Sequence, residues 1–305
     1  MRAFEWVNVF TATPFGGNPL PVVLDADGLS AIEMQAIARE FNTVETTFVL
    51  PPADPAHTAQ VRIFTPMQEL PFAGHPNVGT AYVLARQGHV FGHPVADVLL
   101  FEELAGLVPV QVLREHGAVT GAAFRAPEPF AHRPAPPSTL IASALGLNPF
   151  QIETATHEPV VGSVGLPFVL VALQTRDALA AVAPDVAALT RLFAEAGATG
   201  VLAYAPAGPR DAAAGPCDWS SRMVCLQPNL IEDPATGSAN AALVALRAML
   251  AGVPQSYRMA QGVELGRPSL LQAWTDADGV HVGGSCVPMT VGHLMYKWQR
   301  RLAGA

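Results

Sequence analysis

The sequence has 305 residues, half of them hydrophobic, so it can form one large domain or two ordinary domains with a real core. It contains no apolar run of the about 20 residues that a membrane-spanning helix requires, and its first residues lack the apolar stretch of a secretory signal, so we expect a cytoplasmic protein that does not bind a membrane. A net charge of −8 without a basic stripe argues against nucleic acid as a partner.

The few cysteines and the single lysine narrow the chemistry that the chain can carry. Cys217, Cys225 and Cys286 show no CxxC spacing and are odd in number, which argues against a disulfide framework and a structural zinc site. Lys297 is the only lysine and lies close to the C-terminus. A phosphate-binding GxxxxGK(S/T) loop is therefore absent, and a lysine-bound pyridoxal phosphate is a poor candidate. We expect neither a metal nor another cofactor.

The N-terminal half predicts a helix, two strands, a polar loop and a second helix. These are a helix from Ser30 to about Phe41, strands at Thr46 to Leu50 and Gln60 to Phe64, the loop Phe72 to Pro76, and a helix from Asn77 to Arg86. The first helix begins with a capping box, because Ser30 is followed three residues later by Glu33.

The C-terminal half repeats this order at an offset of about 160 residues. Its expected elements are a helix from Pro184 to about Ala196, strands at Thr199 to Ala205 and Ser221 to Leu226, the loop Glu232 to Gly237, and a helix from Ser238 to Leu250. Arginines recur at equivalent places, Arg62 with Arg222 and Arg86 with Arg247. The repeat predicts a duplicated α+β unit with the second helix central in each half.

A Pro-rich stretch between the halves predicts the domain boundary. Residues 125–138 contain five prolines, which neither a helix interior nor a central strand tolerates. We therefore expect an N-terminal half at 1–126, a linker at 127–138 and a C-terminal half at 139–290, with residues 291–305 rejoining the N-terminal half. A ligand site is expected in the cleft between the halves.

Each half places a glycine-containing loop directly before a helix. The two loops are Ala73-Gly74-His75-Pro76-Asn77 and Asp233-Pro234-Ala235-Thr236-Gly237-Ser238. A helix N-terminus exposes free N–H groups and about half a positive charge, and glycine lets a ligand approach the backbone. Either loop alone is equally well explained as an ordinary helix cap. Their duplication favours a site that binds a carboxylate and stabilises a developing enolate.

Five segments resemble the signature motifs of the PhzF (phenazine biosynthesis protein) family. They are FTATPFGGNP at 10–19, TVETTF at 43–48, FAGHP at 72–76, EDPATGSA at 232–239 and QGVELGRPS at 261–269. The resemblance spans nearly the whole chain in the family's order. It implies a homodimer with the diaminopimelate-epimerase-like α+β fold, in which two pseudo-symmetric halves each wrap a mixed sheet around a central helix and the active site lies between them.

The resemblance also implies the roles of individual residues. Glu45 matches the family's general acid/base, while His75 and Asp233 match its supporting acid/base and hydrogen-bonding groups. The expected substrate-binding residues are Gly74, Asn18, Gly237 and Ser238. Burial of Glu45 beside a strand would raise its pKa, as a proton shuttle needs. Without the motifs, the pattern favours a solvent-facing Glu45, a loop histidine at position 75 and an acidic helix cap at position 233.

The lack of a cysteine in either loop distinguishes this chain from other enzymes with a similar fold. Diaminopimelate epimerases and proline racemases use two opposed cysteines, whereas Ala73 and Pro234 or their neighbours stand at the corresponding places here. Cys225 is the nearest thiol and falls in a strand-like run. One acid/base group, Glu45, suits a proton shift on one face of a substrate better than an inversion.

The sequence therefore predicts a cofactor-independent isomerase that moves a proton within a small carboxylated metabolite, as in the isomerisation of trans-2,3-dihydro-3-hydroxyanthranilate. An epimerase or racemase acting on an amino-acid-like substrate is the first alternative. The second alternative, from a different class, is a small-molecule binding protein without turnover, which would have no need of the acid at position 45.

Overall fold

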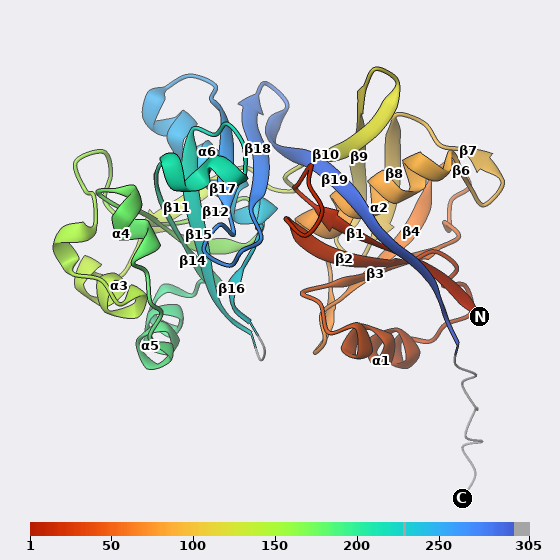
Figure 1. The fold of residues 1–305 in the computed structure, drawn as a ribbon, viewed down its shortest axis with the longest axis horizontal. Helices are drawn as coiled ribbons and strands as arrows, with labels where there is room; N and C mark the ends of the chain where they lie inside the picture. The colour runs from red at the N-terminus through yellow and green to blue at the C-terminus, as the bar shows by residue number, and fades with distance from the viewer. Residues whose placement is uncertain (228–229, 296–305) are drawn as a thin grey trace, which may run out of the picture.

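A computed structural model describes residues 1–227 and 230–295 and places the two halves of the chain side by side (Figure 1). Each half contains a sheet and one long helix, α2 (Gly74–Gln87) or α6 (Gly237–Ala251). Both helices are largely buried, which confirms the prediction that each is central to its own half. The fold is the expected α+β arrangement of two similar units.

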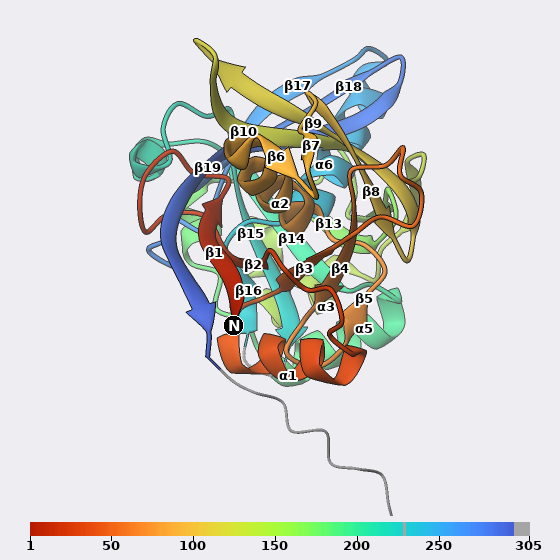
Figure 2. The same ribbon diagram turned by 90° about the vertical axis from the view of Figure 1, so that its right-hand side faces the viewer.

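Eight strands close a ring in the N-terminal half. They pair in the order β1 (Arg2–Val9), β2 (Asn18–Val23), β3 (Thr46–Leu50), β4 (Ala59–Phe64), β8 (Val98–Glu103), β9 (Gly106–Glu115), β10 (Ala118–Arg125) and β19 (Gly279–Leu294), and β19 returns to β1. The pairs β2 with β3 and β4 with β8 are parallel, and the others are antiparallel. Figure 2 shows α2 among these strands.

Helix α2 fits inside this ring because it carries small and apolar residues on every side. Twelve of its 14 residues are buried. Gly79 faces β1 and β2 so closely that an added Cβ atom would lie 2.5 Å from a methyl group of Leu20 and 2.7 Å from one of Val9. The hydroxyl group of Thr80 donates to that of Thr47 on β3 at 2.9 Å.

The remaining elements of this half lie outside the ring. They are α1 (Ala31–Phe41), β5 (Glu69–Leu70) and the hairpin of β6 (His89–Val90) and β7 (His93–Pro94). The capping box predicted for α1 is present, since the backbone N–H of Glu33 donates to Ser30 Oγ and the Glu33 carboxylate accepts from Ser30 N. α1 covers a second small core that contains Met34, Phe48 and Phe64.

The strands of the C-terminal half form a mixed array. They are β11 (Ala131–Pro134), β12 (Val160–Ser163), β13 (Pro167–Ala172), β14 (Gly200–Pro206), β15 (Trp219–Gln227), β16 (Leu230–Asp233), β17 (Ser256–Gln261) and β18 (Ser269–Asp276). The array is continuous with the ring through the pairing of β18 with β19. Helix α6 packs against β18 and β19. The other helical segments, α3 (Ser138–Leu145), η1 (Pro149–Gln151), α4 (Arg176–Ala180), α5 (Val186–Ala196) and η2 (Pro209–Ala213), belong to the same half (Figure 1).

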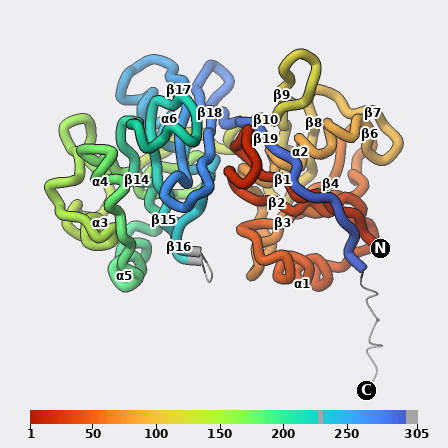
Figure 3. Tube along the Cα trace, viewed as in Figure 1, coloured from red at the N-terminus to blue at the C-terminus, as the bar shows by residue number. Residues whose placement is uncertain are grey.

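Strand β19 joins the two halves. It pairs with β18 over 279–283, with β10 over 281–285 and with β1 from Cys286 to Leu294. The N-terminal strand and the end of β19 therefore lie side by side (Figure 3). The chain returns to the N-terminal half before position 291, and residues 296–305 of the expected returning segment lie outside the described residues.

The Pro-rich segment 127–138 contains a short strand. Within it, β11 pairs with β12 and is exposed along its length, and α3 begins at Ser138. Proline is compatible with such an edge strand because only one side of the strand needs backbone donors. The division of the chain at this segment stays a prediction.

We expect the substitution Gly79→Ala to destabilise the protein by about 1 to 3 kcal/mol, because the added methyl group overlaps Leu20 and Val9 in a closed core. The gain in helix propensity, about 1 kcal/mol, offsets only part of this cost. Urea unfolding followed by circular dichroism measures the change. A variant as stable as the parent protein would show that α2 is not tightly enclosed.

Candidate active site

Four buried polar side chains meet where the two halves touch. Asn18 is the first residue of β2, Glu45 directly precedes β3, His75 lies in the first turn of α2, and Asp233 ends β16. None of them is more than 8% exposed. The structure thus brings together, from both halves, the three predicted catalytic residues and one predicted substrate-binding residue.

Asn18 connects the two halves through its side-chain amide. Its Nδ2 atom donates to Asp233 Oδ1 at 2.8 Å and to the carbonyl oxygen of Ala235 at 3.1 Å, and it lies 3.4 Å from His75 Nδ1. His75 Nδ1 in turn lies 3.4 Å from Glu45 Oε2. Glu45, His75, Asn18 and Asp233 therefore form one continuous polar row across the boundary between the halves.

Several atoms of this row have no partner in the described part of the chain. They are Glu45 Oε2, His75 Nε2 and Asn18 Oδ1, all shielded from solvent and without a hydrogen bond of acceptable geometry. Leaving such a group unpaired costs about 1 to 3 kcal/mol, so native proteins rarely do so without a functional reason. A polar ligand between the halves would supply the missing partners.

Burial shifts the ionisation of all three titratable groups in the row. Desolvation, and then the neighbouring Asp233, raises the pKa of Glu45 well above its ordinary value. Desolvation raises the pKa of Asp233 to about 6, although hydrogen bonds from Thr236 and Asn18 oppose the shift. Desolvation lowers the pKa of His75 to about 3. At neutral pH His75 is therefore uncharged, and its contact with Glu45 is not an ion pair.

The two carboxyl groups have different surroundings. Both oxygens of Asp233 accept hydrogen bonds, Oδ1 from Asn18 and Oδ2 from the hydroxyl group of Thr236. Glu45 Oε2, in contrast, is unpaired. Asp233 is thus held in place as an acceptor, whereas Glu45 retains a free lone pair with which to exchange a proton.

A set of amides that our sequence reasoning missed holds the second loop. Gln261 Nε2 donates to the backbone oxygen of Asp233 at 2.7 Å and to Thr236 Oγ1 at 3.0 Å, and Gln261 Oε1 accepts from Asn240 Nδ2 at 2.8 Å. Gln261 opens one of the motif segments, but only the fold shows that it packs under residues 233–236. Asn240 has a counterpart in Asn77, which lies at the same place in the other central helix. This repeat in the sequence was the signal that could have identified the two asparagines.

Asn77 and Asn240 occupy the same place in the two central helices. Asn77 Nδ2 donates to the carbonyl oxygen of Ala73 at 3.1 Å, and Asn240 Nδ2 donates to that of Thr236 at 3.0 Å. Each asparagine thus ties the first helical turn to the residue that precedes it.

The N-termini of α2 and α6 meet each other at the boundary between the halves. A Cβ atom on Gly74 would lie 3.7 Å from the Cα atom of Gly237, which is an ordinary contact distance, and 2.8 Å from the ring of Phe124, which is the contact that excludes a side chain at this position. The residues before the helices, Ala73 and Thr236, provide no side-chain hydrogen bond to the first turns. Gly74, Gly237 and the partly buried Ser238 therefore surround two helix ends whose N–H groups favour an anion.

The thiol nearest this site does not stand at a helix end. The residues that precede the two helices are Ala73 and Thr236, so Thr236, rather than Pro234, is the structural counterpart of Ala73. Cys225 lies on β15, where burial, followed by the charges of Asp233 and Glu45, raises the pKa of its thiol to about 12. A thiol with such a pKa is a poor base at neutral pH.

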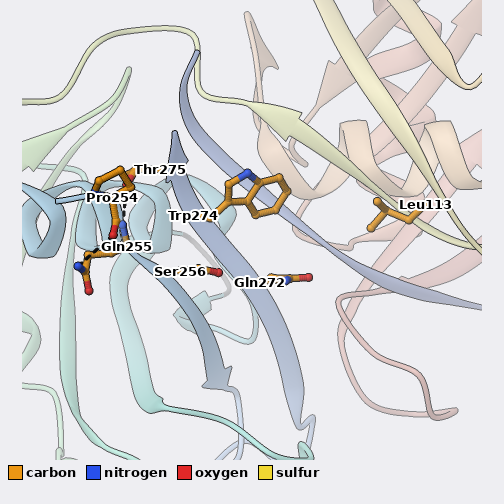
Figure 4. A pocket seen from close by; sticks show the side chains of 7 residues that line it. All are labelled: Leu113, Pro254, Gln255, Ser256, Gln272, Trp274 and Thr275. Carbon is orange, nitrogen blue, oxygen red and sulfur yellow. Dashed lines mark hydrogen bonds between the residues drawn. The ribbon is translucent and has the colours of Figure 1, made fainter. Parts of the chain in front are cut away.

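An open groove of about 420 Å³ lies elsewhere, where β9 approaches β17 and β18 (Figure 4). Its lining residues are Leu113, Pro254, Gln255, Ser256, Gln272, Trp274 and Thr275. They include no acid and no histidine, and none of them belongs to the polar row. This groove does not carry the acid/base chemistry.

The family comparison bears on the same chain segments. A family model described as "phenazine biosynthesis-like protein" (PhzC-PhzF) matches residues 7–292. The chain belongs to the PhzF family. The matched range includes the four residues of the polar row and both helix N-termini.

Individual relatives of this PhzF protein agree with that assignment. An uncharacterised isomerase of Mesorhizobium japonicum is 38% identical over 96% of this chain and 98% of its own. The trans-2,3-dihydro-3-hydroxyanthranilate isomerase of Pseudomonas chlororaphis is 38% identical over 90% of each chain. A PhzF-family phenazine biosynthesis protein of Bacillus anthracis superposes with a TM-score of 0.85 at 23% identity, covering 97% of this chain and 99% of the other. The protein is thus a PhzF-family isomerase.

No helix in residues 1–227 and 230–295 is both long enough and apolar enough to cross a membrane.

The raised pKa of Asp233 predicts how stability depends on pH. The folded protein keeps this proton up to about pH 6, whereas the unfolded chain loses it near the ordinary value of 3.8, so the free energy of unfolding falls as pH rises through that window. We expect Asp233→Asn to remove this loss, which amounts to roughly 3 kcal/mol at and above pH 6.

Urea unfolding at pH 4, 5, 6 and 7 measures this difference. Asp276→Asn is the matched control, because the pKa of Asp276 is lowered and its titration lies below the window. Equal slopes for the parent protein and Asp233→Asn would show that Asp233 is not a buried, proton-bearing acid.

Proposed function

We propose that this PhzF-family isomerase moves a proton between two carbon atoms of a small carboxylated substrate, with Glu45 as the shuttle, and that trans-2,3-dihydro-3-hydroxyanthranilate or a close analogue is that substrate. The observation that carries the proposal is the unpaired Oε2 atom of Glu45 inside a buried polar row. The named activity of the relatives supports the substrate class.

The site separates binding from proton transfer. The substrate carboxylate binds at the N-termini of α2 and α6, near Gly74, Gly237 and Ser238, where helix dipoles and free N–H groups favour negative charge. Removal of a proton from a neighbouring carbon sends the electron pair into the conjugated carboxylate as an enolate. The same helix ends stabilise the charge that develops there.

Glu45 carries the proton from one carbon to the other. In its ionised form it accepts the proton as the C–H bond breaks, and it then returns the proton to the second carbon as the new C–H bond forms. The substrate is rearranged, and the enzyme ends in its starting protonation state. The raised pKa of Glu45 suits both steps, because a base matched to the working pH gives its proton back readily.

His75 and Asp233 position the groups that surround Glu45. Neutral His75 lies beside Glu45, with Nδ1 3.4 Å from Glu45 Oε2, while Asp233 anchors Asn18 and the loop before α6. Because Asp233 accepts hydrogen bonds on both oxygens, it is poorly placed to act as a second base on the opposite face. This favours the proton shift over racemisation, which needs two opposed bases.

The proposal also includes two predictions from the sequence, the cellular location and the oligomeric state. A cytoplasmic location fits the observation that Cys217, Cys225 and Cys286 form no disulfide within the described residues, as is usual in a reducing compartment. A homodimer is carried over from the family resemblance.

We expect Glu45→Gln to lower turnover by about 10² to 10⁴, the usual contribution of a general acid/base, while substrate affinity changes little. Turnover and deuterium incorporation from D₂O are measured on the same substrate. Glu5→Gln, a substitution on β1 outside the polar row, is the control.

Undiminished exchange in Glu45→Gln would remove Glu45 from the mechanism. Deuterium at Cα with loss of optical purity would indicate an epimerase, and no exchange in the parent protein with any carboxylate that it binds would indicate a binding protein.

Cys225→Ser should leave turnover within about twofold of the parent protein, because a thiol with a pKa of about 12 is not a base at neutral pH. Steady-state kinetics on the substrate used for Glu45→Gln measures this. A loss of 10²-fold or more in a folded Cys225→Ser protein would restore a thiol mechanism.

A further inference from the structure

A buried arginine–glutamate pair lies next to the polar row and takes no part in the proposed proton shift. Arg222 is on β15 and Glu232 on β16, and each side chain is only 8% exposed. Arg222 Nε donates to Glu232 Oε1 at 2.8 Å, and Nη2 donates to Oε2 at 2.6 Å, so the contact is bidentate. The residue that follows Glu232 on β16 is Asp233 of the polar row.

Arg222 also binds the backbone around the end of α4. Its Nη1 atom donates to the carbonyl oxygens of Leu179, Ala180 and Val182, at 2.8 to 3.3 Å. A buried guanidinium is stable only when it is paired, and this one is bound on two sides, by a carboxylate and by backbone carbonyls. Through Arg222, Glu232 is therefore tied to a second part of the C-terminal half.

The pair and Asp233 occupy opposite faces of β16. Glu232 is opposite Val224 of β15, and Asp233 is opposite Met223. Val224 packs into the core formed with α3, α4 and α5, whereas Met223 packs into the core that contains the central helices. Because side chains alternate along a strand, Arg222 and Glu232 hold β16 from behind while Asp233 faces Asn18.

The backbone pairing of β16 is short. The strand has four residues, and its register with β15 shifts before Glu232, so a regular ladder covers only Glu232 and Asp233. The bond from Gln261 to the backbone oxygen of Asp233 adds one further contact. A small movement of this strand end would break the 2.8 Å hydrogen bond from Asn18 to Asp233. The side-chain anchor at Glu232 opposes such a movement.

The N-terminal half contains the same pair in the same register. Arg62 Nε donates to Glu69 Oε1 at 2.6 Å, and Nη2 donates to Oε2 at 2.7 Å. In both halves the glutamate is opposite the residue two positions after the arginine. Glu69 precedes Gly74, and Glu232 precedes Gly237, by five positions each. The recurring arginines of the sequence thus belong to one duplicated anchor.

The two anchors differ in the residue that follows them. Leu70 has the place in β5 that Asp233 has in β16. The Arg62–Glu69 pair is also more open, with side chains 23% and 21% exposed, and pairs of this kind contribute little. His75 lies within α2 itself and does not depend on β5 for its place. The N-terminal pair therefore has the same geometry without a polar-row residue beside it.

We propose that Arg222 is a positioning residue, which fixes the end of β16 through its two-point contact with Glu232 and so holds Asp233 against Asn18. A bidentate contact suits this task because it fixes both the distance and the orientation of the carboxylate. The inference rests on the proposed function, since the place of Asp233 matters to turnover only if the polar row is the active site.

Arg222→Lys tests this role, because lysine keeps the positive charge but cannot make the two-point contact. We expect kcat/KM to fall about 10- to 100-fold, as happens when a site group is slightly misplaced, in a protein that circular dichroism shows to be folded. Arg62→Lys makes the same change in the other half, and as the matched control it should stay within about twofold of the parent protein. No loss in Arg222→Lys, or an equal loss in Arg62→Lys, would overturn the proposal.

A double variant separates positioning from general loosening of the fold. If Arg222 acts through Asp233, its replacement has little left to disturb once Asp233 has lost its carboxylate. Arg222→Lys combined with Asp233→Asn should therefore lie within about twofold of Asp233→Asn alone. Losses that multiply would show that Arg222 acts on the protein as a whole, and they would refute the positioning role.

Amide hydrogen exchange followed by mass spectrometry provides a readout that needs no substrate. We expect peptides covering residues 231–236 to exchange about tenfold faster in Arg222→Lys than in the parent protein, with α2 unchanged, and to show no such change in Arg62→Lys. Unchanged exchange at 231–236 in a folded Arg222→Lys protein would overturn the proposal.

A second variant covers the case in which Arg222→Lys does not fold. Glu232→Asp keeps the negative charge but shortens the side chain, and we expect the same changes in turnover and exchange from it. If neither variant folds, the parent protein decides. Protection of 231–236 as strong as that of β15 supports the anchor, and exchange as fast as in the exposed turn at 115–118 overturns it.

The positioning role and the proposed function fail in different ways. Turnover that is lost in Glu45→Gln but unchanged in Arg222→Lys would refute the role of Arg222 and leave the proposed function standing. Absence of turnover and of deuterium exchange in the parent protein would count against the proposed function. Hydrogen exchange at 231–236 would then decide by itself whether the pair fixes the end of β16.

Discussion

The hydrogen bond from Asn18 to Asp233 is the contact on which the site depends. Asn18 comes from the N-terminal half and Asp233 from the other, so neither half alone contains a complete polar row. Segments close to these residues support the contact. Arg267 donates to the carbonyl oxygens of Gly16 and Gly17, and Ser269 Oγ donates to that of Pro234. Three motif segments far apart in sequence, 10–19, 232–239 and 261–269, are therefore packed together just beside the site.

Removal of water turns these ordinary residues into acid/base groups. In water, Glu45 and Asp233 would be ionised at neutral pH and a histidine would titrate near 6.5. Inside the boundary between the halves the same groups are shifted in the directions that disfavour charge, upward for the acids and downward for His75. The acid/base character of these groups is thus a consequence of burial. The unpaired oxygen of Glu45 is the atom of the row through which a ligand can exchange a proton.

The two halves hold the first turn of the central helix with the same asparagine contact, but the side chain next to that asparagine differs. Asn77 and Asn240 tie the first turns of α2 and α6 to the preceding residues in the same way. In the C-terminal half, Asn240 also donates to the amide oxygen of Gln261, a neutral partner. In the N-terminal half the neighbour of Asn77 is Glu103, an acid.

Local patterns in the sequence determined a large part of the fold. The capping box at Ser30, the β-forming run at 46–50 and the helix before Gly197 are visible because each depends on neighbours a few residues away. The duplicated order of elements, which indicated two similar halves, is likewise a property of the chain read in order. The motifs around Glu45 and Asp233 identified the family for the same reason.

Only the tertiary structure decided which polar groups share the interior. Glu103 carries no motif, and its meeting with Asn77 joins β8 to α2 across 26 positions of sequence. Gln261 is in a recognised segment, yet its role under the loop of Asp233 depends on packing between distant strands. Hydrogen bonds and desolvation depend on which atoms are adjacent in space. The closed ring and the boundary between the halves bring distant residues into contact, and a pattern read along the sequence does not show which residues these are.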